Sequence, residues 1–268
     1  MMVGSFRAEL VKIRRPATGY GALAMMAFAA LATVLTFVAA KTGPARVSVK
    51  DPGGNIVTTL SQLGSAAGIS RGYNVASGLI GLVVFVLFVT AITGEYAQGT
   101  MRVMLTREPR RARYLTGRLA ALLLLVAVVL LAALVASIGA ALISAQVRGV
   151  PTGQWFTSAG FGHVAGDYLN SVVTAACFGA LGTALGLAVR STPLALGVGL
   201  AWLLPIEHIL QTSWSAAPQW LPGLLSDAVA VGGSVGVSYL HAVVAAVGYA
   251  FVAAVLGVAV FMRRDAST

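Results

Sequence analysis

Long apolar runs separated by short polar segments dominate this sequence. An α-helix rises 1.5 Å per residue, so a run of about 20 apolar residues matches the roughly 30 Å hydrocarbon core of a bilayer. Runs of this kind predict spans at about residues 20–40, 72–93, 119–145, 167–189, 193–211 and 239–262. We therefore predict an all-α membrane protein in which residues 1–268 form a single transmembrane domain with six membrane-spanning helices.

The fifth run differs from the others. Its charge-free stretch covers only residues 191–206, contains Pro205 and is closed by Glu207. Proline removes one backbone hydrogen bond from a helix, so we predict a broken fifth span. Two tryptophans and two prolines follow within residues 212–238, a composition that predicts an outer loop or a re-entrant pair of short helices.

Three flanking segments carry weaker patterns. Residues 1–15 have apolar positions on one helical side among basic residues, which predicts an amphipathic interfacial helix, with a frayed basic tail as the alternative. Residues 41–71 alternate around an Asp-Pro-Gly-Gly turn, which predicts a small hairpin in an outer loop. In the loop at about residues 146–166, Trp155 and Phe156 suit the interfacial aromatic belt.

Residues 94–118 form the longest charged segment of the chain. They include six arginines and two glutamates, between charge-free runs of 23 residues before and 29 after. Such a segment does not fit a bilayer core, and the positive-inside rule orients it toward the cytoplasm. The inner segments of this topology hold 13 of the 18 lysines and arginines, so we expect both termini to be cytoplasmic as well.

The first half of this segment also has helical periodicity. Glu95 suits a helix N-terminus, and Pro109 predicts a break. The apolar positions fall on two stripes, one of Tyr96, Thr100 and Val103 and one of Met101, Met104 and Leu105. A solvent-exposed loop does not need apolar stripes of its own, so the pattern predicts contact with a second protein or with the membrane surface.

Composition supports a polytopic membrane protein. Hydrophobic residues make up 58% and charged residues 10%, with a mean hydropathy of +0.88, whereas soluble domains have about 25% charged residues. The net charge of +10 arises at the ends of apolar runs, where membrane orientation explains it without nucleic acid. Cys177 is the single cysteine, so no disulfide framework exists, and the spacing of Gly182 and Gly186 is typical of close helix packing.

Catalytic motifs are absent from the sequence. Without a phosphate-binding GxxxxGK[ST] loop, the chain is not expected to bind and hydrolyse ATP, and it has neither HExxH nor GxSxG. His163, His208 and His241 lack metal-ligand spacing, so we predict no metal site and no catalytic residue. Glu207 is the carboxylate placed nearest the membrane interior, where it would either line a substrate path or extend from a helix end into the headgroups.

The charged segment resembles the first inner loop of permease subunits of type-2 ABC exporters. The matching positions are Glu95, Gly99-Thr100, Leu105, Pro109 with Arg110, Tyr114-Leu115 and Gly117-Arg118. Arg110 stands where many members have an aliphatic residue. The resemblance implies a coupling helix that docks on a separate ATP-binding subunit, with ATP and magnesium held there. The implied docking residues are Glu95, Tyr96, Gly99, Thr100, Met101, Met104, Leu105, Pro109 and Arg110.

The same resemblance implies export by alternating access across a bacterial cytoplasmic membrane. Two permease chains, identical or different, would enclose the path of an amphipathic or lipid-like substrate. Spans two and five line that path in similar proteins, which makes Asn74 and Glu207 the candidates here. A membrane scaffold or sensor that transports nothing, and a proton-coupled carrier using Glu207, stay open as alternatives.

Overall fold

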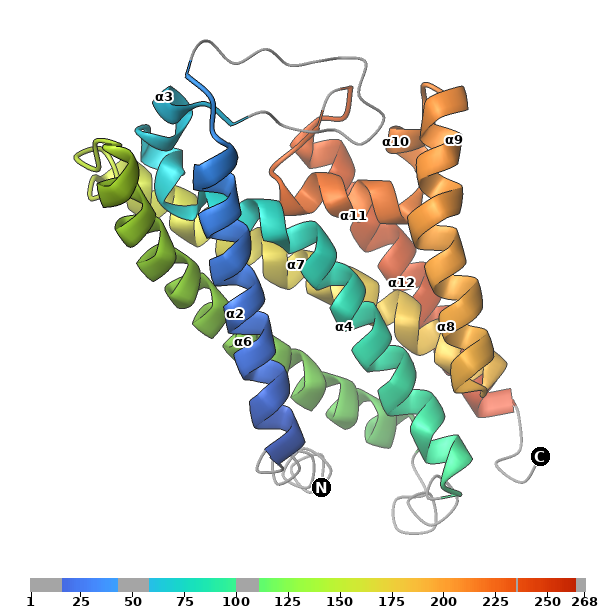
Figure 1. The fold of residues 1–268 in the computed structure, drawn as a ribbon. Helices are drawn as coiled ribbons and strands as arrows, with labels where there is room; N and C mark the ends of the chain where they lie inside the picture. Colours follow the sequence, from blue (N-terminus) through green and yellow to red (C-terminus); the bar gives the residue numbers. More distant parts are fainter. Residues whose placement is uncertain (1–15, 43–57, 100–110, 235, 264–268) are drawn as a thin grey trace.

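The computed structural model describes residues 16–42, 58–99, 111–234 and 236–263, and helices without any β-strand account for nearly all of them (Figure 1). Within this part of the chain, six helical stretches are long and apolar enough to cross a membrane. They are Gly19–Ala39, Ala66–Ala97, Leu115–Arg148, Ser158–Val189, Thr192–Ser213 and Tyr239–Met262. The chain is therefore an all-helical, multi-pass membrane protein, as its apolar runs predict.

Five of the spans are built on continuous α-helices. These are α2 (Pro16–Ala39), α4 (Arg71–Ala97), α6 (Arg111–Arg148), α7 (Ser158–Val189) and α12 (Tyr239–Arg263). Hydropathy placed the cores of these helices correctly but not their ends. The helix α7 begins at Ser158 rather than near residue 167, and α4 continues past residue 93 into the charged segment. Helical hydrogen bonding extends beyond the most apolar stretch of each span, and hydropathy reports apolarity but not where a helix begins or ends.

The fifth span stays helical through its proline. It comprises α8 (Thr192–Ala201), a π-helical segment (Trp202–Ile206) and α9 (Glu207–Ser213). Pro205 lies inside the π-helical segment, and the backbone N–H of Glu207 bonds to the carbonyl of Trp202. A π-turn shifts the hydrogen bonds locally from i→i−4 to i→i−5. This shift accommodates the backbone N–H that proline lacks. The fifth span is thus irregular at Pro205, as predicted, but the helix continues through the proline to Ser213 and is not broken there.

The helices α4 and α7 pack along one another and form the centre of the bundle. The helices α2 and α6 lie on one side of this pair, and α8 and α12 lie on the other (Figure 1). A Cβ atom at Gly182 would lie 2.8 Å from the carbonyl oxygen of Phe85, and one at Gly186 would lie 3.3 Å from Ile92. The predicted small-residue face of α7 is therefore the surface that lets α4 approach closely.

Trp155 is a core residue rather than part of an interfacial belt. It is fully buried, its ring meets Phe37 edge-on with centroids 6.2 Å apart, and its Nε1–H donates to the carbonyl of Leu63 at 2.8 Å. The neighbouring Phe156 is 58% exposed. The expectation for Trp155 was wrong because α3 (Leu60–Leu63), a short helix in the predicted outer loop, supplies an acceptor for the indole.

The other described elements between the spans are short helices. A 3₁₀-helix (Ala66–Ser70) leads into α4, so the described end of the predicted hairpin segment is helical. The turn at residues 51–54 and the predicted amphipathic helix at residues 1–15 lie outside the described residues. After α9, the chain forms two short helices, α10 (Ala217–Trp220) and α11 (Pro222–Ala230), which is the second of the two alternatives that the sequence left open, without showing whether they are re-entrant.

Replacing Trp155 with phenylalanine should destabilise the fold. The change leaves the buried carbonyl of Leu63 without its donor, which typically costs about 1–3 kcal/mol. Trp214, which is 44% exposed, provides the matched control through Trp214→Phe. Thermal unfolding of both purified variants in the same detergent should give a clearly lower midpoint only for Trp155→Phe. Equal midpoints would contradict the structural role of the indole.

Candidate functional site

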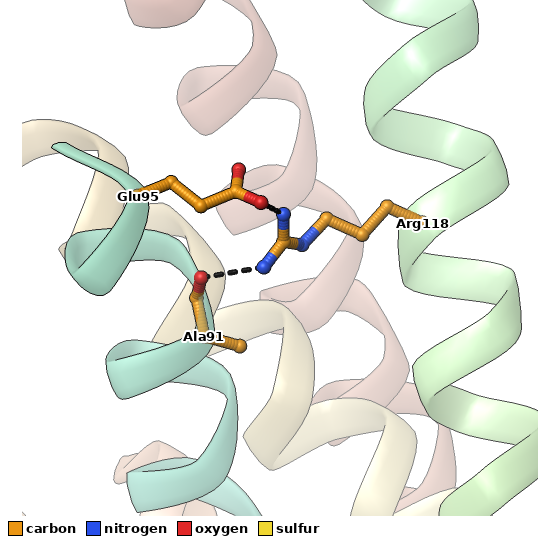
Figure 2. Close-up of polar contacts among 3 residues, drawn as sticks. All are labelled: Ala91, Glu95 and Arg118. Atoms are coloured by element: carbon orange, nitrogen blue, oxygen red, sulfur yellow. Dashed lines mark hydrogen bonds and ion pairs between the residues drawn. The ribbon is translucent and has the colours of Figure 1, made fainter. Parts of the chain in front are cut away.

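A buried ion pair between Glu95 and Arg118 joins α4 to α6 on either side of the charged segment, and we call the region around these two residues the base of the segment. Near the end of α4, the carboxylate of Glu95 pairs with the guanidinium of Arg118 from α6, and Arg118 Nη2 also donates to the carbonyl of Ala91 at 2.6 Å (Figure 2). Glu95 is 7% exposed and Arg118 is 4% exposed. The charges are therefore held inside the protein, between the two helices that flank residues 98–110.

The sequence explains why one arginine reaches both acceptors. Ala91 and Glu95 are four residues apart, so they lie one above the other on the same face of α4. The planar guanidinium of Arg118 directs its two terminal nitrogens to this face from α6. Because breaking a buried pair strands the partner's charge, loss of one member typically costs about 3–5 kcal/mol.

Apolar contacts around this pair join four spans. The buried cluster contains Ile92 from α4, Leu115 from α6, Leu187 from α7 and Phe261 from α12, with the half-buried Tyr96 packed against it. These helices converge at the end of the bundle where α4 ends and α6 begins (Figure 1). A displacement of the charged segment's base would therefore act on four spans together.

Polar contacts extend this connection to the turn between α7 and α8. The Arg190 guanidinium carbon lies 5.1 Å from the ring centroid of Tyr96, within the range of a cation–π contact. Arg190 ends α7 in a left-handed conformation with φ of 58°, and its N–H bonds to the carbonyl of Gly186. The hydroxyl of Thr93 lies 2.7 Å from that of Thr192 in α8. The end of α4 is thus connected to α6, to α8 and to the turn between α7 and α8.

The structure places three of the nine predicted docking residues. Glu95 points inward to Arg118, and Tyr96 lies against Arg190, so both belong to the base of the segment. Gly99 is exposed and has φ of 66°, a conformation that glycine adopts without strain where the chain leaves α4. The other six, which are Thr100, Met101, Met104, Leu105, Pro109 and Arg110, lie outside the described residues.

Asn74, the first predicted path residue, belongs to a polar cluster near the start of α4. It is 5% exposed, and its amide nitrogen donates to Asp167 Oδ1 at 3.1 Å and lies 3.4 Å from the carbonyl oxygen of Ala230. Ser70 donates to Asp167 Oδ2 at 2.6 Å. The cluster joins the N-terminal part of α4 to α7 and to the end of α11. It makes Asn74 a packing residue in this conformation.

Glu207, the second predicted path residue, caps a neighbouring helix. Its carboxylate is fully buried and accepts backbone hydrogen bonds from Gly223 at 3.2 Å and Leu224 at 2.9 Å. These N–H groups belong to the first turn of α11, where a helix has unpaired donors and the positive end of its dipole. The sequence-based interpretations placed this carboxylate in a path or among headgroups, and neither included the cap. The Pro222-Gly223 start of α11 was the available signal.

Asp227 lies one turn further along α11. Its Oδ1 would be 3.4 Å from a Cβ atom placed on Gly78 of α4, so the half-buried carboxyl faces the bundle interior. Burial raises the pKa of Asp227 to about 6, and the nearby carboxylate of Glu207 also raises it, while His208 acts in the opposite direction. The sequence shows Asp227 in the segment after the fifth span but does not predict its burial, because its environment depends on the position of α11.

Comparison with protein-family models identifies the chain as a member of the family described as "Protein of unknown function (DUF2705)". The model of this family matches residues 28–267, a region that includes the charged segment and the later spans entirely. No curated protein matches the chain. The family description states no activity, so the function has to be argued from the arrangement of the residues.

Breaking the Glu95–Arg118 pair should cost more than removing it. Glu95→Gln and Arg118→Met each leave one buried polar partner unmatched, and we expect each to destabilise the fold by about 3 kcal/mol or more. The double variant leaves no stranded charge and should recover much of the loss. Thermal unfolding in detergent across the full double-mutant cycle measures this coupling. Additive losses would contradict a paired role.

The raised pKa of Asp227 predicts a pH dependence of stability. A carboxyl whose pKa rises from 3.8 to about 6 on folding destabilises the fold when ionised above pH 6, and protonation at lower pH removes that penalty. Asp227→Asn should therefore raise the melting temperature at about pH 7.5 and reduce the stabilisation seen on lowering the pH to about 5. An unchanged pH profile in this variant would show that other groups control it.

Proposed function

We propose that this chain is the permease subunit of an ATP-driven exporter of the type-2 ABC class, in which a separate subunit binds and hydrolyses ATP. The observation that carries the proposal is the buried base of the charged segment, where Glu95 and Arg118 fix α4 to α6. A segment that receives force from a partner needs such a base. Without it, movement of residues 98–110 would be absorbed by bending instead of moving the spans.

The contacts around this base supply a route for the proposed transmission. A push on the segment acts on α4 and α6 together through their ion pair, and on α7 and α12 through the shared apolar cluster. It reaches α8 through the Thr93–Thr192 contact. Closure of the partner subunits around ATP and magnesium would then move the spans between inward-open and outward-open arrangements.

In this proposal the docking residues lie beyond the base. Gly99 lets the chain leave α4 without strain, and Met101, Met104 and Leu105 supply the apolar stripes that meet the partner. Glu95 and Tyr96 instead support the segment from within the bundle, because Glu95 is buried and Tyr96 is packed on Arg190. The segment and both termini face the bacterial cytoplasm.

The proposed path involves spans two and five, whose buried polar residues include Asn74 and Glu207. In the present conformation both are bonded to neighbouring helices, and α11 contacts both of them. Exposure of either side chain to an amphipathic or lipid-like substrate therefore requires α11 to move. A second permease chain, identical or related, would close the path, and α10 and α11 would be re-entrant from the outer side.

The alternatives make different demands on the same residues. A proton-coupled carrier using Glu207 would have to protonate a carboxylate whose two oxygens cap α11, so each cycle would release that helix. A scaffold or sensor needs a docking surface but no connection to four spans. Flux that follows ATP, flux that follows the proton gradient and the absence of flux distinguish these functions.

Affinity purification tests the proposed partner. The tagged full-length chain, extracted from its native host in mild detergent, should bring down an ATP-binding subunit in comparable amount. Met104→Arg with Leu105→Arg should abolish this association, since charge at a buried apolar contact is strongly unfavourable. Glu95 is left unchanged so that its ion pair stays intact.

Gln154→Arg provides the control for added charge, because this exposed residue lies at the opposite end of the bundle. It should retain the partner. Absence of an ATP-binding subunit from the wild-type preparation, or equal loss in the control, would contradict the proposal.

A further inference from the structure

Two carboxyl groups lie beside the same face of α11, one turn apart. Gly223 and Asp227 are separated by four residues, so their side-chain positions lie one above the other on the helix. The carboxylate of Glu207 occupies the space in front of Gly223, where a Cβ atom would lie 2.6 Å from its Oε2. Asp227 carries the second carboxyl about 6 Å further along this face. One group thus comes from α9 and the other from α11 itself.

These two carboxyl groups have different hydrogen-bond partners. Glu207 accepts two backbone N–H groups, from Gly223 and Leu224, which stabilise its ionised form. Asp227 is half-buried and faces Gly78 of α4, and within the part of the chain that the structure describes its carboxyl accepts no hydrogen bond. A partly desolvated carboxylate without donors, beside a second carboxylate, is less stable ionised than it is in water. Asp227 is therefore the member of this pair that favours a bound proton.

The other ionisable groups near α11 come from the helices packed against it, which are α4, α7, α9, α10 and α12. From α9, His208 also acts on Asp227, and its protonated form favours the ionised carboxyl, opposite to the effect of Glu207. The remaining described groups act elsewhere: Arg71 and Asp167 on each other, Cys177 within the apolar cluster of Leu225, and His241 and Tyr249 on backbone carbonyls of α10. Glu207 and His208 are therefore the charged groups that matter to Asp227.

The backbone allows α11 to move as a unit. Leu221, before its first residue, is extended, with φ of −86° and ψ of 130°. After its last turn, Gly232 has φ of 80° and Gly233 has φ of 114°, conformations that glycine adopts without strain. Between these breaks, side chains hold both ends of the helix, through the Glu207 cap at the start and through Asn74, 3.4 Å from the carbonyl oxygen of Ala230, at the end. Asp227 lies between the two attachments.

We propose that Asp227 binds a proton while α11 is packed against α4, and that this proton determines how firmly α11 is held. A protonated Asp227 places a neutral carboxyl between Glu207 and Gly78. An ionised Asp227 repels Glu207 and gains hydration when the helix leaves. Release of α11 frees Glu207 from the cap and Asn74 from Ala230. This inference does not rest on the exporter function, because all of these groups belong to this chain.

The direction of the pH dependence follows from the pKa of Asp227 in the two positions of α11. With the helix packed, burial raises this pKa from 3.8 to about 6, and hydration after release returns it to the ordinary value. The packed state therefore binds more protons than the released state between these two values, and the full penalty on packing applies above pH 6. Lowering the pH from about 7 to about 5 should reduce the ratio of released to packed α11 about tenfold.

Hydrogen exchange of the full-length protein in detergent, read by mass spectrometry at about pH 7 and pH 5, tests the proposal. Correction for the pH dependence of chemical exchange gives an opening constant for the amides of α11 and for those of α7. In the wild type, α11 should open more readily than α7 at pH 7, and its opening constant should fall about tenfold at pH 5. Asp227→Asn should remove this pH dependence. Asp265→Asn, the same change near the C-terminus and outside the described residues, should retain it.

A second variant and an internal comparison keep this test decisive. Thermal unfolding identifies a variant that fails to fold, and Asp227→Ala then replaces Asp227→Asn, because it also removes the ionisable group. A wild-type opening constant of α11 that is the same at both pH values would overturn the proposal, as would an undiminished pH dependence in the folded variant. Equal opening constants for α11 and α7 at pH 7 would also overturn it, because α11 would then leave only when the whole bundle unfolds.

Discussion

The arrangement of this protein depends on one buried pair of charges. Glu95 and Arg118 are withdrawn from water at the point where two spans meet the charged segment, and each is tolerable there only because the other is present. Their pairing fixes the register of α4 against α6. The apolar cluster around Ile92 and Phe261 then extends that register to α7 and α12. A polar segment that would otherwise be a simple connection thereby acquires a rigid base.

In the opposite half of the bundle, buried polar groups must also be paired, and hydrogen bonds rather than an ion pair do this. Helix ends and polar side chains away from water need partners, and several of these partners come from another element. Glu207 caps α11, Asn74 and Ser70 bond to Asp167, and Tyr239 donates to Asn170 at 2.7 Å. The short helix α11 is held by such contacts on several sides. It is therefore the element whose displacement would expose buried polar groups.

Hydropathy and proline position were sufficient to predict the six spans, the irregular fifth span and the two short helices. Both signals are local, and a bilayer imposes length and apolarity on each span separately. Side-chain partners are not local. Trp155 became a core residue because Leu63 offers a carbonyl, and Glu95 became an internal ion-pair partner because Arg118 lies across from it on another helix. The sequence marked Glu95 and Glu207 as unusual without revealing which distant groups satisfy them.

The proposed function requires that residues beyond this base contact an ATP-binding protein. The most direct measurement places a photo-crosslinking amino acid at position 101 in the full-length chain within its native membrane, with position 154 at the other end of the bundle as the comparison. We predict that position 101 crosslinks to a protein carrying an ATP-binding motif and that position 154 does not. Crosslinking of position 101 only to lipid, or only to another copy of this chain, would contradict it.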